Sequence, residues 1–222
     1  MKERLLNIAT VLVAACCVAV IGMAVWNSFE SPAPAAAASA FRQVENWQPA
    51  AAGGRLIGPA DARVRVVVFS DFECAGCGRA AEALRVLQQR WPDDVALVFR
   101  HYPLESIHPN AVPAALAAEC AAEQGRFEAY HDALFARREQ LGTVDWAALA
   151  REVGVPDADE FGRCVAEERH FDRVGQDVAA GDAIGIQGTP TIVVEGRVAV
   201  GGSSGAQVQA WVQEALARGG AR

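Results

Sequence analysis

Two cysteines separated by two residues, Cys74 and Cys77, are the side chains in this sequence best placed to do chemistry. They follow the apolar run Val64–Phe69, which is rich in β-branched residues and typical of a buried strand. They precede the segment Arg79–Trp91, whose apolar residues recur at helical spacing. A cysteine between a strand and a helix lies at the positive end of the helix dipole, which stabilises the reactive thiolate. By itself the pair fits redox exchange, a static disulfide or half of a zinc site.

The composition of the chain narrows its class. With 222 residues it has room for one domain and an appendage, or for two small domains. A hydrophobic content of 52% supports a folded core, and a net charge of -7 without blocks of like charge argues against nucleic acid as a partner. Outside an N-terminal apolar segment the cysteines are an even set, as an oxidising compartment permits. This set is Cys74, Cys77, Cys120 and Cys164.

Residues 1–30 have the pattern of a signal anchor or a signal peptide. Lys2 and Arg4 precede an uncharged run whose apolar core, Leu5–Trp26, would reach about 33 Å as a helix. This length suffices for a bilayer core of about 30 Å and exceeds the apolar region of most cleaved signal peptides. We therefore favour an uncleaved anchor, with the basic N-terminus inside and the rest of the chain outside the cytoplasm.

Residues 31–52 are predicted to form an Ala/Pro-rich linker, and residues 53–222 a folded domain. The strand Val64–Phe69, its helix and a second buried strand form a unit in which the two strands normally pair in parallel. The sequence from Arg100 to Gly185 then has helical patterns throughout. The other expected elements are an edge strand at Leu56-Ile57, the second buried strand Val95–Phe99, a hairpin of Ile192–Val194 with Val198–Val200, and a closing helix Ala206–Ala217.

This order of elements, with Cys-x-x-Cys at the first strand-to-helix turn and Thr189-Pro190 before the third main strand, resembles the thioredoxin fold. A helical insertion at about residues 104–185 narrows the resemblance to the DsbA-like thiol–disulfide oxidoreductases. It implies an α/β fold, thioredoxin-like with an inserted α-helical domain, preceded by an N-terminal transmembrane or signal-anchor helix. The resemblance spans roughly residues 53–217 and rests on Asp71-Phe72-Glu73-Cys74 with Cys77, Arg100-His101-Tyr102-Pro103-Leu104, His108-Pro109-Asn110-Ala111 and Gly188-Thr189-Pro190-Thr191.

The resemblance implies a role for each residue of the site. Cys74 is the exposed nucleophile, and Cys77 is the more buried thiol that resolves a mixed disulfide on Cys74. The Thr189–Pro190 bond is cis and packs against the active-site disulfide, where neighbouring backbone can pair with an extended substrate. The redox-active Cys74–Cys77 disulfide is then the only redox group needed, with no further cofactor and no metal.

The resemblance also suggests a second, non-catalytic disulfide between Cys120 and Cys164. The alternative is a pair of buried reduced thiols. A zinc site is disfavoured because there is no second Cys-x-x-Cys. Three histidines could be taken for catalytic groups, but we interpret them as packing or helix-boundary residues. They are His101, His108 and His131.

The dipeptide Ala75-Gly76 departs from the better-known relatives, which carry Pro-His in strong oxidants and Gly-Pro in thioredoxins. It supplies no imidazole near the sulfur, so the extent of thiolate stabilisation stays open. The strand Val64–Phe69 also lacks the buried carboxylate that many relatives use as a proton acceptor. Asp71 and Glu73 are close in sequence, but we expect both to be solvated and neither to act as the base.

We therefore expect an extracytoplasmic enzyme of the periplasm or the outer membrane face, tethered by the N-terminal helix. It would exchange disulfides with exported cysteine-containing proteins, as an oxidase, and a membrane redox partner would recycle its dithiol. One alternative reverses the electron flow and makes the protein a disulfide reductase or isomerase. Another is a non-enzymatic accessory in metal handling or cytochrome assembly on the same scaffold.

Overall fold

The computed structural model describes residues 42–201 and 205–219. The predicted signal anchor at residues 1–30 lies outside the described residues, as do residues 31–41 of the linker, so these assignments remain predictions. Among the described residues, no helix combines the length and the hydropathy needed to cross a bilayer.

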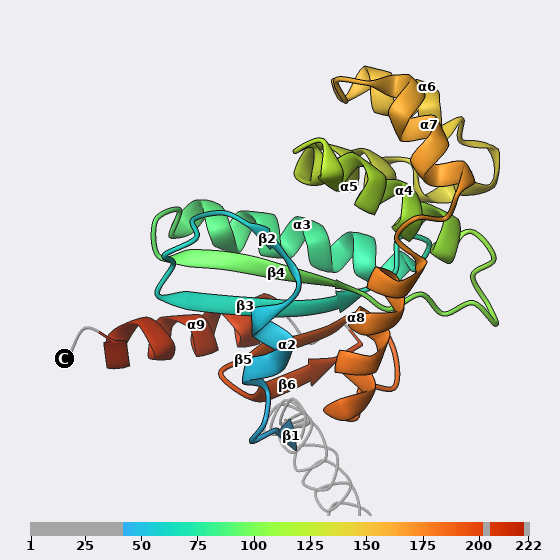
Figure 1. Ribbon diagram of the computed structural model, residues 1–222. Helices are drawn as coiled ribbons and strands as arrows, with labels where there is room; N and C mark the ends of the chain where they lie inside the picture. Colours follow the sequence, from blue (N-terminus) through green and yellow to red (C-terminus); the bar gives the residue numbers. More distant parts are fainter. Residues whose placement is uncertain (1–41, 202–204, 220–222) are drawn as a thin grey trace, which may run out of the picture. The chain divides into compact units, whose positions relative to one another are not determined.

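In the described part of the chain, six strands form one mixed sheet (Figure 1) in the order β1-β6-β5-β3-β4-β2. The central strands β3 and β4 are parallel, as predicted, and the other neighbouring pairs are antiparallel. The short strand around Leu56 lies at one edge of the sheet, also as predicted. The strands are β1 (Arg42–Gln43), β2 (Arg55–Ile57), β3 (Val64–Ser70), β4 (Val95–His101), β5 (Thr191–Val194) and β6 (Arg197–Val200).

Helices cover both faces of this sheet, which explains why β3 and β4 are almost continuously apolar. Val66 and Val68 pack in a core with α3 and α9, whereas Val67 and Phe69 face a second core beside α2 and α8. The helices α4 to α7 lie together at one end of the sheet (Figure 1) and form the insertion. The helices are α2 (Gln48–Ala52), α3 (Ala75–Arg90), α4 (Ala111–Glu123), α5 (Phe127–Ala136), α6 (Trp146–Glu152), α7 (Ala158–Ala166), α8 (Phe171–Ala183) and α9 (Gly205–Gly219), with a 3-10 turn at Arg138–Thr143.

The predicted order of strand, helix, strand, helical block, two strands and helix is confirmed, but two boundaries were wrong. Residues 42–52 are not linker, because β1 pairs with β6 and α2 buries Ala50 and Ala51 against the sheet. The alanine-rich segment 48–52 has no hydrophobic periodicity from which this could be predicted. The helix after the cysteines begins at Ala75, so Cys74 lies at its N-terminal end, as predicted.

The second correction concerns the segment from Arg100 onward, which was predicted to be helical throughout. Strand β4 continues through Arg100 and His101, residues 102–110 form a connecting segment, and the first helix of the insertion begins at Ala111. Pro103 and Pro109 in this segment remove backbone donors that a helix would need. Further along, Phe171, the first residue of α8, is 56% exposed.

Buried charges tie the end of β4 to the helices. The carboxylate of Glu119 on α4 has no exposed surface and accepts hydrogen bonds from Arg55 on β2 and, at 2.9 Å, from Nε2 of His101. Burial raises the pKa of Glu119, but the hydrogen bonds from His101 and Arg55 outweigh burial and hold that pKa well below its usual range. Asp177 on α8 is equally buried and accepts from Nη1 of Arg100 at 2.6 Å.

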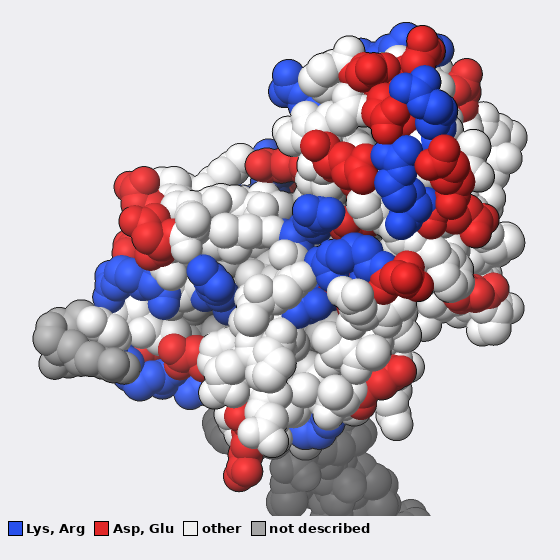
Figure 2. All heavy atoms as spheres, in the orientation of Figure 1, with Lys and Arg blue, Asp and Glu red and all other residues white. Residues whose placement is uncertain are grey.

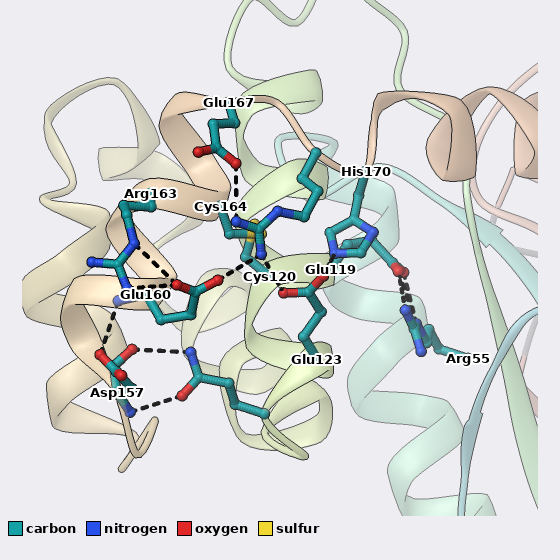
Figure 3. Close-up of a disulfide and its surroundings, with 12 residues drawn as sticks. Arg55, Glu119, Cys120, Glu123, Asp157, Glu160, Arg163, Cys164, Glu167 and His170 are labelled. Atoms are coloured by element: carbon teal, nitrogen blue, oxygen red, sulfur yellow. Dashed lines mark hydrogen bonds and ion pairs between the residues drawn. A yellow bond between two sulfur atoms is a disulfide. The ribbon is translucent and has the colours of Figure 1, made fainter.

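A disulfide joins Cys120 on α4 to Cys164 on α7, with Cα atoms 5.8 Å apart and both side chains fully buried. Figure 3 shows this disulfide beneath a chain of ion pairs that includes Arg163 with Glu160. Exposed pairs of this kind contribute about 0–1 kcal/mol each, whereas closing a loop of this size stabilises by about 4 kcal/mol in the chain-entropy model. Figure 2 shows acidic and basic side chains interspersed over α6 and α7. The insertion is therefore held mainly by its core and its disulfide.

Candidate active site

The two cysteines lie at the point where β3 passes into α3. Cys74 is the N-cap residue, with extended backbone angles of φ -71° and ψ 124°, and Cys77 lies in the first turn of α3. No side chain caps this end of the helix, so the first backbone N–H groups are directed towards the N-cap residue. A negative sulfur on Cys74 is stabilised by these groups and by the helix dipole.

The two thiols are free in the structure and differ in exposure. Cys74 is partly exposed, whereas Cys77 has no exposed surface. The backbone N–H of Asp71 donates to Sγ of Cys77 at 3.4 Å, and Sγ of Cys74 lies 3.7 Å from the carbonyl oxygen of Thr189. Only Cys74 is therefore accessible to a partner, while Cys77 can reach nothing except Cys74 and the protein interior.

A hydrogen bond between the two thiols separates their acidities. The Cys77 thiol donates to the Cys74 sulfur, and this bond, helped by backbone N–H groups of Cys77 and Gly76 and opposed by burial, lowers the pKa of Cys74 to about 5. The same bond, together with burial, raises the pKa of Cys77 far above that of a free thiol. Near neutral pH the reduced pair thus consists of a Cys74 thiolate and a Cys77 thiol.

The peptide bond Thr189–Pro190 is cis, as the resemblance implied, and immediately precedes β5, which pairs with β3. The proline ring packs on the dipeptide between the cysteines. A Cβ atom at Gly76 would lie 2.9 Å from Cδ of Pro190 and 3.6 Å from Sγ of Cys74, which is too close for any side chain without a shift of the ring. Ala75, by contrast, is exposed. Gly76 thus marks a close contact that the sequence alone did not reveal.

The structure contradicts the expectation that Asp71 is solvated. Asp71 is 2% exposed, and its Oδ1 accepts from the backbone N–H of Glu73 at 2.8 Å. Its Oδ2 accepts from the backbone N–H of Leu104 at 2.9 Å and lies 2.7 Å from Nδ1 of His108. Each carboxylate oxygen is therefore already engaged, which explains how a carboxylate can be buried at this place.

Glu73 was also expected to be solvated and is instead partly buried. It accepts from the backbone N–H of Asn110 at 2.7 Å and from Nδ2 of Asn110 at 2.9 Å. Asn110 is the N-cap residue of α4, but its side chain bonds Glu73 rather than the helix. We call these contacts of Asp71 and Glu73 with Leu104, His108 and Asn110 the acidic clasp. It fixes the segment between β4 and α4 beside the turn that carries Cys74.

The other predicted histidines are buried, in keeping with a packing role. His101 bonds Glu119, and Nδ1 of His131 lies 2.8 Å from Oδ1 of Asp132. Within the described residues, one group of potential metal ligands lies close together, made up of Cys120, Cys164 and His170. Because two of these three form a disulfide, they offer no thiolate to a metal.

Comparison with known proteins agrees with this geometry. The thioredoxin family model matches residues 50–214. The structure of a thioredoxin-like oxidoreductase from Silicibacter pomeroyi DSS-3 is 30% identical and covers 74% of this chain and 93% of its own, with a TM-score of 0.62. The structure of DsbA2 from Pseudomonas aeruginosa is 26% identical and covers 72% of this chain and 92% of its own, with a TM-score of 0.58.

Among curated proteins, the Na(+)/H(+) antiporter NhaA 3 of Salinispora tropica is 44% identical over 140 residues. The matched region is 63% of this chain but 21% of the antiporter. The chain thus spans about a fifth of the length of that relative.

The acidity of Cys74 can be tested through its rate of alkylation. We expect the rate of iodoacetamide labelling of the reduced protein to rise with pH about a midpoint near 5. A Cys77→Ala variant, which removes the main hydrogen bond, should move that midpoint towards the free value of about 8.5. Labelling quenched at set times and analysed by mass spectrometry gives the rate against pH for both proteins. In the wild type, unlabelled Cys77 is the internal control. Equal midpoints above pH 7 in both proteins would contradict the assignment.

The same shift predicts a pH-dependent stability of the reduced protein. Because the pKa of Cys74 is lower in the folded protein than in the unfolded chain, its thiolate stabilises the fold fully above about pH 8.5. This contribution is lost as pH falls through about 5. Urea unfolding of the reduced protein and of a Cys74→Ser variant across this range should converge at low pH.

The contact between Gly76 and Pro190 predicts that the two residues between the cysteines tolerate substitution differently. Gly76→Ala forces the proline ring to move and should lower the free energy of unfolding by about 1–3 kcal/mol. The matched control Ala75→Ser, at an exposed position, should change it by less than about 0.5 kcal/mol. Urea unfolding of the oxidised proteins measures both. Equal effects at the two positions would show that Pro190 does not limit position 76.

Proposed function

The chain belongs to the thioredoxin family, within its DsbA-like branch, and we propose that it is a thiol–disulfide oxidoreductase that exchanges disulfides with exported proteins through Cys74 and Cys77. One observation carries the proposal. A partly exposed thiol of low pKa lies at a helix N-terminus, a second thiol is buried in the first turn of that helix, and a cis-proline packs against Gly76 between them. A structural disulfide does not require two cysteines that differ in this way in pKa and exposure.

The proposed exchange follows from the geometry. In the oxidising direction, a substrate thiolate attacks Sγ of Cys74 in the Cys74–Cys77 disulfide, and the electron pair of that bond leaves on Sγ of Cys77. A second substrate thiolate then attacks the substrate sulfur of the mixed disulfide and expels the Cys74 thiolate, which is a good leaving group because of its low pKa. The substrate gains a disulfide and the protein is left as a dithiol.

The low pKa of Cys74 favours this direction over the reverse. Stabilising the thiolate stabilises the reduced protein, which raises the reduction potential of the pair. A pKa of about 5 lies between the values of about 7 for thioredoxin and about 3.5 for DsbA. The proposed role is therefore that of an oxidase, although the chain has no imidazole between its cysteines.

Thr189 and Pro190 are the proposed substrate-contacting residues. The carbonyl oxygen of Thr189 lies 3.7 Å from Sγ of Cys74, and Pro190 contributes no N–H to the backbone at this place. An extended substrate segment can pair with backbone of this kind while its cysteine reaches Cys74. The Thr189 hydroxyl lies beside the sulfurs and helps to lower the pKa of Cys74, so it can donate to the sulfur when that sulfur is negative.

The proposed location is extracytoplasmic, with the chain tethered by residues 1–30 and reoxidised by a membrane redox partner. The basic start and long apolar run of the sequence support the tether. The buried Cys120–Cys164 disulfide fits a compartment in which disulfides persist. The redox-active pair is the only redox group that the proposed reaction needs.

The direction of electron flow is tested by the reduction potential of the Cys74–Cys77 pair. We expect a value more oxidising than about -200 mV, between thioredoxin at about -270 mV and DsbA at about -120 mV. Equilibration in glutathione buffers followed by acid quench, alkylation and mass spectrometry gives this value. A Cys120→Ala, Cys164→Ala variant serves as the control and should show the same potential. A value near -270 mV would overturn the oxidase assignment in favour of a reductase or isomerase.

The exchange activity is tested by trapping its intermediate in cells. A Cys77→Ala variant cannot resolve mixed disulfides, so it should accumulate covalent complexes with several exported proteins. These complexes should disappear with reductant and should be absent from a Cys74→Ala, Cys77→Ala control. Non-reducing electrophoresis followed by mass spectrometry identifies the partners. Stoichiometric copper binding without any trapped protein would instead indicate a metal-handling accessory.

A further inference from the structure

The buried thiol Cys77 needs a donor and acceptor of protons, and the acidic clasp does not supply one. Whenever the Cys74–Cys77 disulfide opens, Sγ of Cys77 becomes negative in a fully buried place and must take up a proton. Asp71 is the nearest carboxylate in sequence, but both its oxygens already accept hydrogen bonds, and only its backbone N–H contacts Cys77. The proton therefore has to come from elsewhere.

A cavity lies between α3, α5 and the sheet. Val68 and Ser70 of β3 line its inner part, and Phe135 of α5 lines its wall. The cavity offers about 40 Å³ to the centres of water molecules, whereas one water needs about 10–15 Å³. Three exposed charged side chains surround its mouth, so it leads from the protein interior to solvent. They are Arg85, Glu128 and Asp132.

Ser70 connects this cavity to Cys77. It is the last residue of β3, is 4% exposed and lies on the face of the strand that packs against α3. Its hydroxyl forms a hydrogen bond with the Cys77 thiol, and this contact favours the thiolate form of Cys77. A hydroxyl can donate one proton while it accepts another, so Ser70 is able to pass a proton between the sulfur and a group in the cavity.

His131 is the only titratable side chain with a neutral base form that lines the cavity. It is 7% exposed, and its ring packs against Phe99 and Phe135 with ring centroids 4.9 Å away in each case. Its Nδ1 lies 2.8 Å from Oδ1 of Asp132 at the mouth. Among the described residues, no hydrogen bond to its Nε2 is found, so that nitrogen can bond water in the cavity that the ring lines.

The charges that face His131 come from two helices. Asp132 and Glu128 are carboxylates of α5, on which His131 itself lies. Arg85 on α3 carries the opposite charge and is paired with Glu82 at 2.7 Å. His131 is thus hydrogen-bonded to a carboxylate and lines a cavity that opens to solvent, an arrangement suited to a group that passes protons.

We propose that His131 is a proton relay for Cys77, acting through the hydroxyl of Ser70 and water in the cavity. The inference rests on the proposed exchange function. When the disulfide opens, the sulfur–sulfur electron pair leaves on Cys77, Ser70 gives its proton to that sulfur, and His131 returns a proton to Ser70. When Cys77 attacks a mixed disulfide on Cys74, the proton moves in reverse and the expelled partner thiolate is protonated by solvent.

The proposed relay is tested by measuring how fast Cys77 resolves a mixed disulfide on Cys74. Glutathione disulfide converts the reduced protein into a mixed disulfide at Cys74, and acid quench with mass spectrometry follows its resolution by Cys77 between pH 5 and 9. In the wild type we expect the resolution rate to level off as pH rises towards neutral. His131→Phe, which keeps the aromatic packing, should slow resolution at pH 7 by about 100-fold and make the rate rise steadily with pH. Ser70→Ala should act in the same direction.

The controls separate the relay from a loss of structure. His170→Phe changes a histidine on the far side of the insertion that pairs with Glu123, and should leave the profile unchanged. Formation of the mixed disulfide at Cys74 should stay within about twofold in every variant. An unchanged profile in folded His131→Phe, or the same change produced by His108→Gln instead, would overturn the relay but leave the exchange function intact. If the wild type formed no mixed disulfide at Cys74, the exchange function itself would fail.

Discussion

The carboxylate of Glu119 has no exposed surface, and much of the site depends on it. It joins Arg55 of β2 and His101 of β4 to α4, while Asp177 joins Arg100 to α8. Removing one partner from a buried pair of this kind typically costs about 3–5 kcal/mol, because the other charge is left uncompensated. These contacts fix the end of β4, from which the chain runs directly into the acidic clasp and so to the turn that carries Cys74. The insertion thus positions the chemistry as well as surrounding it.

The residues between the cysteines illustrate how contact, and not only composition, determines what a short motif does. In the sequence, Ala75-Gly76 stands out by the absence of the imidazole found in strong oxidants. In the structure, Gly76 provides the space in which Pro190 reaches the dithiol. The low pKa of Cys74 arises instead from the Cys77 thiol and from backbone N–H groups, all of which are present with any residue except proline at position 76. The identity of the dipeptide therefore matters less for the pKa of Cys74 than for how closely Pro190 approaches the two cysteines.

Much of the fold could be predicted from the sequence because its core elements are patterned. The apolar strands β3 and β4, the amphipathic α3 and the return to sheet after Gly188 each have a local signal. The errors at Arg100, His101 and Asp71 share one cause, which is that these polar residues were judged without their partners far away in the sequence. Arg100 and His101 lie in a strand because carboxylates on α4 and α8 compensate them, and Asp71 is buried because Leu104 and His108 bond it. Carboxylates are mostly exposed in proteins, so no local pattern could have signalled this burial.

The opposite pKa shifts of Cys74 and Cys77 have a common origin, and this links acidity to redox state. A single hydrogen bond between the two sulfurs lowers one pKa and raises the other. That bond exists only in the dithiol, so oxidation removes an interaction that stabilises the reduced protein, which makes the pair a stronger oxidant. The Cys120–Cys164 disulfide joins α4 to α7, away from the turn that carries Cys74 and Cys77. The active pair can therefore cycle between its two states while the insertion, and with it the acidic clasp, stays in place.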